Sequence, residues 1–154
     1  MVDLILWRHA EADEADDQGD DLQRALTHKG ERQAERMAGW LHRQLASTTR
    51  VLVSPARRTQ QTAQTLQRKF KTVEALAPDG TVEGLLHAAR WPDSREPVLV
   101  VGHQPTLGVT ASYLLHDSTH PWALRKGGVL WLRGREREGQ LQVVLHAALT
   151  PDML

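Results

Sequence analysis

The sequence predicts a three-layer α/β/α sandwich with a mixed, mostly parallel sheet and a C-terminal antiparallel hairpin. Short runs rich in Val, Leu and Ile alternate with helical patterns, which favours strands that pair in parallel through crossover helices. The last two apolar runs are separated only by a charged turn, which favours a hairpin. The length of 154 residues suits one domain, which we expect to span residues 1–154.

Five apolar runs are expected to form strands, and a further short strand is expected between the second and third helices. The five runs cover residues 4–7, 50–53, 98–101, 128–132 and 141–147. The final two are joined by residues 134–139, which begin and end with glycine and carry charged residues between. Strands and helices therefore alternate until this last pair.

Four helices are expected between the strands. Thr27 can cap the first, at about residues 28–46, because apolar residues follow it at helical spacing. These residues are Ala34, Met37, Ala38, Leu41 and Leu45. The other helices are expected at 57–70, at 81–90 with Thr81 as its cap, and from Pro105 and Thr106 to about residue 115.

Composition excludes several classes of protein. Lys plus Arg and Asp plus Glu both number 19, so no general attraction to nucleic acid or to a membrane surface is expected. The chain contains no cysteine and therefore has neither a disulfide framework nor a thiolate nucleophile. No apolar segment is long enough to span a bilayer, and the first residues lack a basic signal region. We expect a cytoplasmic protein, with a monomer favoured.

Titratable side chains follow three of the expected strands. Arg8 and His9 follow the first, Arg57 and Arg58 follow the second, and His103 follows the third. Helices begin after the second and third strands, and helix N-termini attract anions. Chemistry in open α/β folds is found beyond the carboxyl ends of the strands. If these strands are neighbours, the side chains form a phosphate pocket that contains a nucleophile.

One segment, residues 11–21 with the sequence "EADEADDQGDD", is strongly acidic. Seven of its eleven residues are Asp or Glu, which favours a solvated loop. A calcium loop is the alternative, but aligning Gly19 with the turn glycine places Gln18 and Ala25 at ligand positions. No metal site is expected, and His116 and His120 are interpreted as exposed residues despite their spacing.

Three blocks, "RHAEA", "SPARRTQQTA" and "VGHQP", together resemble the signature blocks of the histidine phosphatase superfamily, also called phosphoglycerate mutase-like. The short length, the segments "LTHKGERQA" and "LAPDG", and the lack of a long helical insertion are most similar to its small SixA-type branch of phosphohistidine phosphatases. The resemblance covers residues 4 to about 149. It implies the three-layer α/β/α fold of that superfamily, without a cap domain.

The resemblance also implies site residues. His9 matches the nucleophile, and Arg8 matches the arginine that precedes it and binds phosphate. The pattern Ser-Pro-x-x-Arg selects Arg58 over Arg57 as the second phosphate-binding arginine. His103 matches the histidine that contacts the transferring phosphoryl group, and a protonated ring there would add a hydrogen-bond donor. Ala10 departs from the usual glycine, which costs little where φ is negative.

The general acid of the larger members has no clear counterpart. The candidate proton donors are Glu11, Glu74 and Asp79, which lie near the expected strand ends. A phosphomonoester needs such an acid because its alcohol leaves as an alkoxide. Phosphohistidine needs it less, because a protonated imidazole ring can leave neutral. This difference modestly favours phosphohistidine as the substrate.

The sequence therefore predicts a metal-independent phosphatase, without a cofactor, that forms a covalent phosphohistidine intermediate. The favoured substrate is a phosphorylated histidine on a signalling or phosphotransfer protein, presented to an open pocket that binds the phosphate ion. One alternative is a phosphatase for a small phosphate ester such as a sugar or nucleotide phosphate. Another is a phosphate-binding or phosphoprotein-binding module without turnover.

Overall fold

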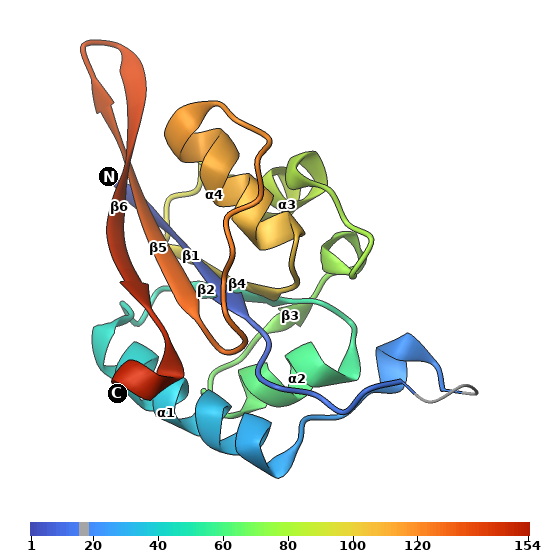
Figure 1. The fold of residues 1–154 in the computed structure, drawn as a ribbon. Helices are drawn as coiled ribbons and strands as arrows, with labels where there is room; N and C mark the ends of the chain where they lie inside the picture. Colours follow the sequence, from blue (N-terminus) through green and yellow to red (C-terminus); the bar gives the residue numbers. More distant parts are fainter. Residues whose placement is uncertain (16–18) are drawn as a thin grey trace.

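The computed structural model describes residues 1–15 and 19–154, and its strands form one mixed sheet (Figure 1). Within the described residues the sheet has six strands in the order β3-β2-β4-β1-β5-β6. Their bounds are β1 Val2–Arg8, β2 Arg50–Val53, β3 Lys71–Thr72, β4 Val98–Gly102, β5 Val129–Arg137 and β6 Gln140–Leu149. Strands β1 to β4 pair in parallel, whereas β5 is antiparallel to β1 and β6 is antiparallel to β5.

Helices cover both faces of the sheet, which confirms the three-layer prediction (Figure 1). The α-helices are α1 His28–Gln44, α2 Arg57–Gln64, α3 Val82–Ala89 and α4 Thr106–His116. Short 3-10 helices are η1 Asp21–Gln23, η2 Glu74–Leu76 and η3 Pro151–Met153. None of the helices in the part of the chain that the structure describes is both long and apolar enough to cross a membrane.

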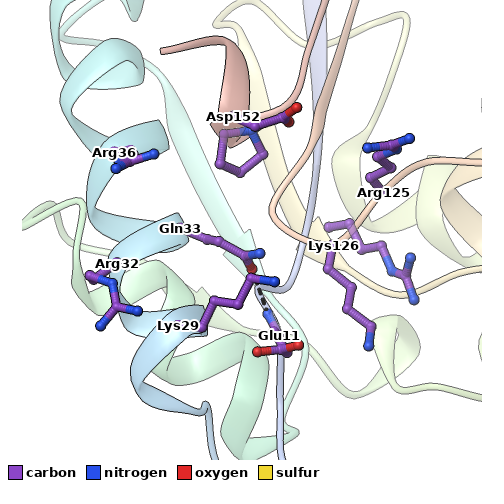
Figure 2. A pocket seen from close by; sticks show the side chains of 10 residues that line it. Glu11, Lys29, Arg32, Gln33, Arg36, Arg125, Lys126 and Asp152 are labelled. Atoms are coloured by element: carbon purple, nitrogen blue, oxygen red, sulfur yellow. Dashed lines mark hydrogen bonds between the residues drawn. The ribbon is translucent and has the colours of Figure 1, made fainter.

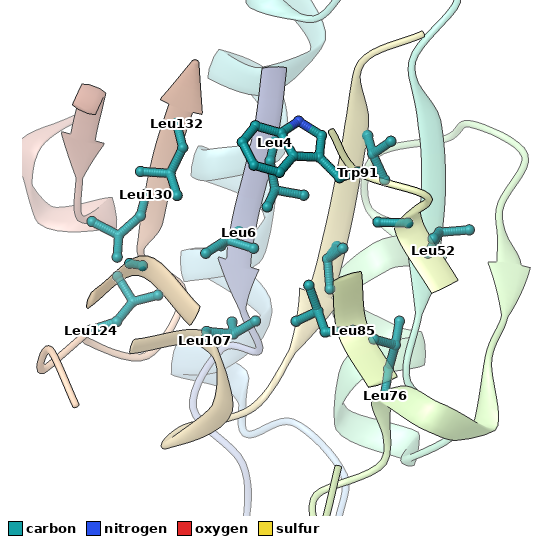
Figure 3. Close-up of a cluster of buried hydrophobic side chains, with 14 residues drawn as sticks. Leu4, Leu6, Leu52, Leu76, Leu85, Trp91, Leu107, Leu124, Leu130 and Leu132 are labelled. Carbon is teal, nitrogen blue, oxygen red and sulfur yellow. The ribbon is translucent and has the colours of Figure 1, made fainter. Parts of the chain in front are cut away.

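Strand β1 is buried on both faces because its alternate side chains enter two different cores. Leu4 and Leu6 pack with Leu85 of α3 and Leu107 of α4 in one apolar cluster (Figure 3). Ile5 and Trp7 point to the other face and belong to the cluster that contains Met37 and Leu41 of α1. This near-continuous apolar run is typical of a central strand in a sheet covered on both sides.

The helix N-termini agree with the sequence prediction, but one helix ends early. Thr27 caps α1 by accepting a hydrogen bond from Gly30 N at 2.9 Å, and Thr81 caps α3 in the same way. Helix α2 was expected to reach residue 70 but ends at Gln64. Its last turn tightens into i, i+3 bonds, and Gln67 then adopts a left-handed conformation with φ 57°.

The C-terminal hairpin turn is also shorter than predicted. Strands β5 and β6 continue to Arg137 and Gln140, so the turn consists of Glu138 and Gly139 instead of residues 134–139. Both turn residues have positive φ, at 54° and 77°, which suits a two-residue hairpin turn. Gly134 lies inside β5, where an added Cβ would be 2.7 Å from the ring of Trp91.

Candidate active site

The strand register brings the predicted site residues to one edge of the sheet. Arg8 pairs with Gly102, and Val53 pairs with Val101, so β1, β2 and β4 end side by side. Beyond these ends, His9 N donates to Gly102 O at 3.1 Å and Ser54 N donates to Val101 O at 3.1 Å. The rings of His9 and His103 lie with their centroids 5.4 Å apart.

His9 is a buried, neutral imidazole with a defined orientation. Its side chain is 6% exposed, and its Nδ1 lies 2.7 Å from the carbonyl oxygen of Ala10. Because a carbonyl can only accept, the proton lies on Nδ1 and Nε2 keeps its lone pair. Burial, with the charges of Arg58 and Arg8, lowers the pKa of His9 to about 4, although the Ala10 hydrogen bond acts in the opposite direction. Nε2 is therefore available as a nucleophile at neutral pH.

Ala10 occupies the usual glycine position without backbone strain. It does not adopt a positive φ, and its N–H donates to the Thr62 hydroxyl of α2 at 3.1 Å. The departure from glycine at this position is therefore compatible with the local backbone.

His103 is held by a serine from the neighbouring strand end. Its Nε2 lies 2.7 Å from Ser54 Oγ, which also accepts the N–H of Ala56 at 3.2 Å. Burial first, and then electrostatic repulsion from His9 and Arg58, lower the pKa of His103 to about 3. The ring is therefore neutral at neutral pH and can donate from one nitrogen, whereas a protonated His103 beside a bound phosphate stays a prediction.

Two guanidinium groups complete the cluster. Arg8 is partly buried, and its Nη1 donates to Leu124 O at 2.8 Å. Arg58, which is 4% exposed, comes from the first turn of α2, whereas Arg57 beside it is exposed to solvent. Burial, and then the charge of Arg58, lowers the pKa of Arg8. The guanidinium groups of Arg8 and Arg58 therefore lie close enough for their charges to affect each other and both imidazoles.

Three buried nitrogens of this cluster have no hydrogen-bond partner among the described residues. They are Arg8 Nε, Arg58 Nε and His103 Nδ1. Buried polar groups in proteins are nearly always paired, and a catalytic or binding role is one of the recognised explanations for unpaired ones. The cluster combines positive charge with unused nitrogens, which is the donor set that an oxyanion requires.

Asp21 is a site contact that sequence reasoning missed. Arg58 Nη1 donates to the Asp21 carbonyl at 2.8 Å, and Arg58 Nη2 donates to the Asp21 carboxylate at 3.1 Å. A hydrogen bond from Arg24 and then one from Arg58 lower the pKa of Asp21. Asp21 belongs to the acidic segment predicted to be a solvated loop, and its sequence gives no signal that separates it from the other acids there.

The rest of the acidic segment agrees with the loop prediction where it is described. Asp13, Glu14 and Asp20 are exposed, whereas residues 16–18 lie outside the described part of the chain, and with them the calcium alternative at Gln18. Elsewhere in residues 1–15 and 19–154, no three His, Asp or Glu side chains lie close enough to hold a metal ion. His116 and His120 are exposed, as expected.

None of the three candidate proton donors is hydrogen-bonded to the imidazoles in the described residues, so their role stays a prediction. Glu74 and Asp79 are exposed, and no hydrogen bond from either to the cluster occurs in the described residues. Glu11 is partly buried, and its carboxylate accepts from the Thr27 hydroxyl at 2.8 Å. The open pocket stays a prediction, because the exposure of the histidines alone does not decide it. His9 and His103 are 6% and 3% exposed, and η1 lies against Arg58.

Comparison with known proteins gives a consistent set of matches. A model of the histidine phosphatase superfamily (branch 1) matches residues 4–83, a range that includes Arg8, His9 and Arg58 and ends before His103. Phosphohistidine phosphatase SixA of Escherichia coli K12 is 33% identical over 129 residues, which cover 78% of each chain. An uncharacterized protein of Picosynechococcus is 32% identical over 142 residues, which cover 86% of this chain and 85% of that protein.

The fold is matched over nearly its whole length by a solved structure. The protein histidine phosphatase SixA complexed with tungstate aligns with a TM-score of 0.80 and 25% sequence identity. The alignment covers 99% of both chains. The similarity thus extends from the signature blocks to the complete architecture.

Proposed function

Since the chain belongs to the histidine phosphatase superfamily, in its small SixA-type branch, we propose that it is a phosphatase that removes the phosphoryl group from a histidine of another protein through a phosphorylated His9. One observation carries the proposal. The hydrogen bond from His9 Nδ1 to Ala10 O leaves Nε2 as a free nucleophile beside His103, between the charges of Arg8 and Arg58.

In the first step, the lone pair of His9 Nε2 attacks the phosphorus atom. The bond from Nε2 to phosphorus forms while the bond from phosphorus to the substrate imidazole breaks, and that imidazole leaves with the electron pair. Its ring is protonated in the substrate, so it departs neutral. In the second step, water attacks the phosphorus, the bond to His9 breaks, and inorganic phosphate is released.

The cationic side chains stabilise the charge that spreads over the phosphoryl oxygens during both steps. Arg8 and Arg58 retain unused N–H groups, among them the buried Nε of each. Ser54 Oγ accepts from Ala56 N and lies 2.7 Å from His103 Nε2, and in the proposed mechanism its hydroxyl proton is assigned to that nitrogen. That arrangement places the ring proton of His103 on Nδ1, where a neutral imidazole donates to the phosphoryl group.

The carboxylates near the site support phosphohistidine over an alcohol ester. Glu74 and Asp79 are exposed and make no hydrogen bond to the cluster among the described residues, and Glu11 accepts from Thr27. Asp21 touches Arg58, but its lowered pKa keeps it ionised at neutral pH, so it is a poor proton donor. A substrate whose leaving group already carries its proton suits a site built in this way.

The proposal is tested by trapping the intermediate. A protein phosphorylated with ³²P on histidine is mixed with wild type and with His9→Ala, and label on the enzyme is measured after acid and after base treatment. We expect label on wild type that is labile to acid and stable to base, and none on His9→Ala with an unchanged circular dichroism spectrum.

Two results would overturn the proposal. Absence of both label and turnover would favour a binding module that holds phosphate or a phosphoprotein. Faster turnover of p-nitrophenyl phosphate than of the phosphohistidine protein would favour a phosphatase for small esters instead.

A further inference from the structure

A basic cleft of about 710 Å³ lies beside the candidate active site (Figure 2). Figure 2 shows Lys29, Arg32 and Arg36 on the α1 side, with Arg125 and Lys126 on the opposite side. Arg8 also lines the cleft and belongs to the cluster around His9. Six cationic side chains therefore line this cleft, against the two acids Glu11 and Asp152.

This concentration of positive charge is not a consequence of composition. The whole chain has equal numbers of acidic and basic residues. Helix α1 also contains both signs, but it separates them: its cations at 29, 32 and 36 line the cleft, whereas Glu31 and Glu35 do not. Spacings of three and four residues place side chains on one face of a helix.

The cleft cations are also unused within the molecule. No salt bridge to Lys29, Arg32, Arg36, Arg125 or Lys126 occurs in the described part of the chain. All five are exposed. Six like charges with only two acids beside them repel one another, and an acidic ligand would relieve that repulsion.

The wall of the cleft that carries Arg125 and Lys126 is connected to His9 by backbone hydrogen bonds. Gly127 N donates to His9 O at 2.9 Å, and Arg8 N donates to Gly128 O at 3.0 Å. Arg8 Nη1 donates to Leu124 O, the residue before Arg125. A surface bound in the cleft therefore contacts the chain segment that positions His9.

We propose that this cleft docks an acidic face of the phosphoprotein substrate, next to the histidine that carries the phosphoryl group. The inference rests on the proposed function. An extended protein surface fits better than a small anion because the five exposed cations lie on long side chains along two separate walls. Attraction of this kind speeds association and weakens as salt concentration rises.

Two matched peptides test the docking surface. Both contain one phosphohistidine, flanked by glutamates in one peptide and by glutamines in the other. For wild type we expect kcat/KM to be about tenfold higher on the glutamate peptide, mainly through KM, and to lose that preference at 0.5 M salt, about where the Debye length falls below ~5 Å. The variant Arg32→Glu/Arg36→Glu should lose the preference without a change in kcat or in kcat/KM on the glutamine peptide.

The control variant Arg43→Glu/Lys69→Glu makes the same change in net charge outside the cleft and should keep the preference. Equal kcat/KM on the two peptides, or an unchanged KM in Arg32→Glu/Arg36→Glu, would overturn the proposal. Binding of the unphosphorylated glutamate peptide, measured by fluorescence anisotropy, tests docking even if the phosphatase activity fails. Tighter binding of a nucleoside triphosphate that Arg32→Glu/Arg36→Glu abolishes would assign the cleft to a small molecule and contradict docking of a protein.

Discussion

The imidazole rings of His9 and His103 face a common space at the ends of β1 and β4, with centroids 5.4 Å apart and planes inclined by 53°. Burial and the nearby guanidinium groups keep both rings neutral at neutral pH. Two neutral rings can take different roles toward one phosphoryl group. In the proposed mechanism, His9 supplies a lone pair to phosphorus and His103 donates a hydrogen bond to an oxygen.

Replacing Arg58 should damage catalysis far more than replacing Arg57. Arg58 is buried beside the imidazoles, whereas Arg57 is exposed at the start of the same helix. We expect Arg58→Ala to lower kcat by about 10²–10³, the scale for losing one donor to a developing charge. Arg57→Ala should change kcat less than about threefold. Steady-state kinetics on a phosphohistidine protein measure kcat for both variants. A larger loss of kcat in Arg57→Ala would show that Arg58 is not the second phosphate-binding arginine.

The contact from Asp21 should position Arg58. Asp21→Asn keeps the side-chain size but removes the charge that holds Arg58 Nη2 at 3.1 Å. We expect kcat/KM to fall about tenfold, which corresponds to the roughly 1.4 kcal/mol of one charge-assisted hydrogen bond. Asp13→Asn removes an exposed charge from the same segment and should have little effect. Faster turnover in Asp21→Asn would show that the carboxylate competes with phosphate for Arg58.

The positions of the four clustered residues could be predicted because each follows an element with a strong local signal. Arg8, His9 and His103 follow buried apolar runs, and Arg58 lies in a helix that begins after such a run. Parallel strands then place these ends at one edge of the sheet. The choice of Arg58 over Arg57 came from the resemblance to the histidine phosphatases, because periodicity alone does not separate adjacent residues at a helix start.

Features that depend on tertiary contacts could not be predicted. Asp21 reaches Arg58 across 37 residues of sequence, and nothing local distinguishes it from the other acids of its segment. The early end of α2 depends on the left-handed turn at Gln67, a residue type without a strong preference for it. The basic cleft could not be predicted from the sequence either, since residues 29–36 and 125–126 come together only in the folded chain.

Two glycines of α1 should respond to alanine in opposite directions. At Gly30 an added Cβ would overlap the carbonyl oxygen of Glu11, a backbone atom that cannot move aside independently. We expect Gly30→Ala to lower the free energy of unfolding by about 1–3 kcal/mol, as overpacking does. At Gly39 the nearest atom to an added Cβ is the flexible end of Arg43, at 3.7 Å. Gly39→Ala should therefore raise the free energy of unfolding by up to about 1 kcal/mol. Urea unfolding measures both, and equal effects would contradict the close approach at Gly30.

Acid should destabilise the protein in part through the two buried histidines. Their pKa values are lowered from the ordinary 6.5 to about 4 for His9 and about 3 for His103, in both cases mainly by burial. Between these values and 6.5 the unfolded chain binds more protons than the folded one. The free energy of unfolding therefore falls as the pH drops from 7 to 5.

The contribution of His103 to this decrease in the free energy of unfolding can be measured by comparing wild type with His103→Ala. A group protonated only when unfolded loses about 2 kcal/mol of stability between pH 7 and pH 5 when its unfolded pKa is about 6.5. Urea unfolding of wild type and His103→Ala at both pH values cancels the contribution of the groups the two proteins share. We expect the decrease between pH 7 and pH 5 to be smaller by about 2 kcal/mol in His103→Ala. An equal decrease in both proteins would mean that His103 accepts its proton in the folded state near its ordinary pKa, and a charged ring at that position would then be the donor to phosphate.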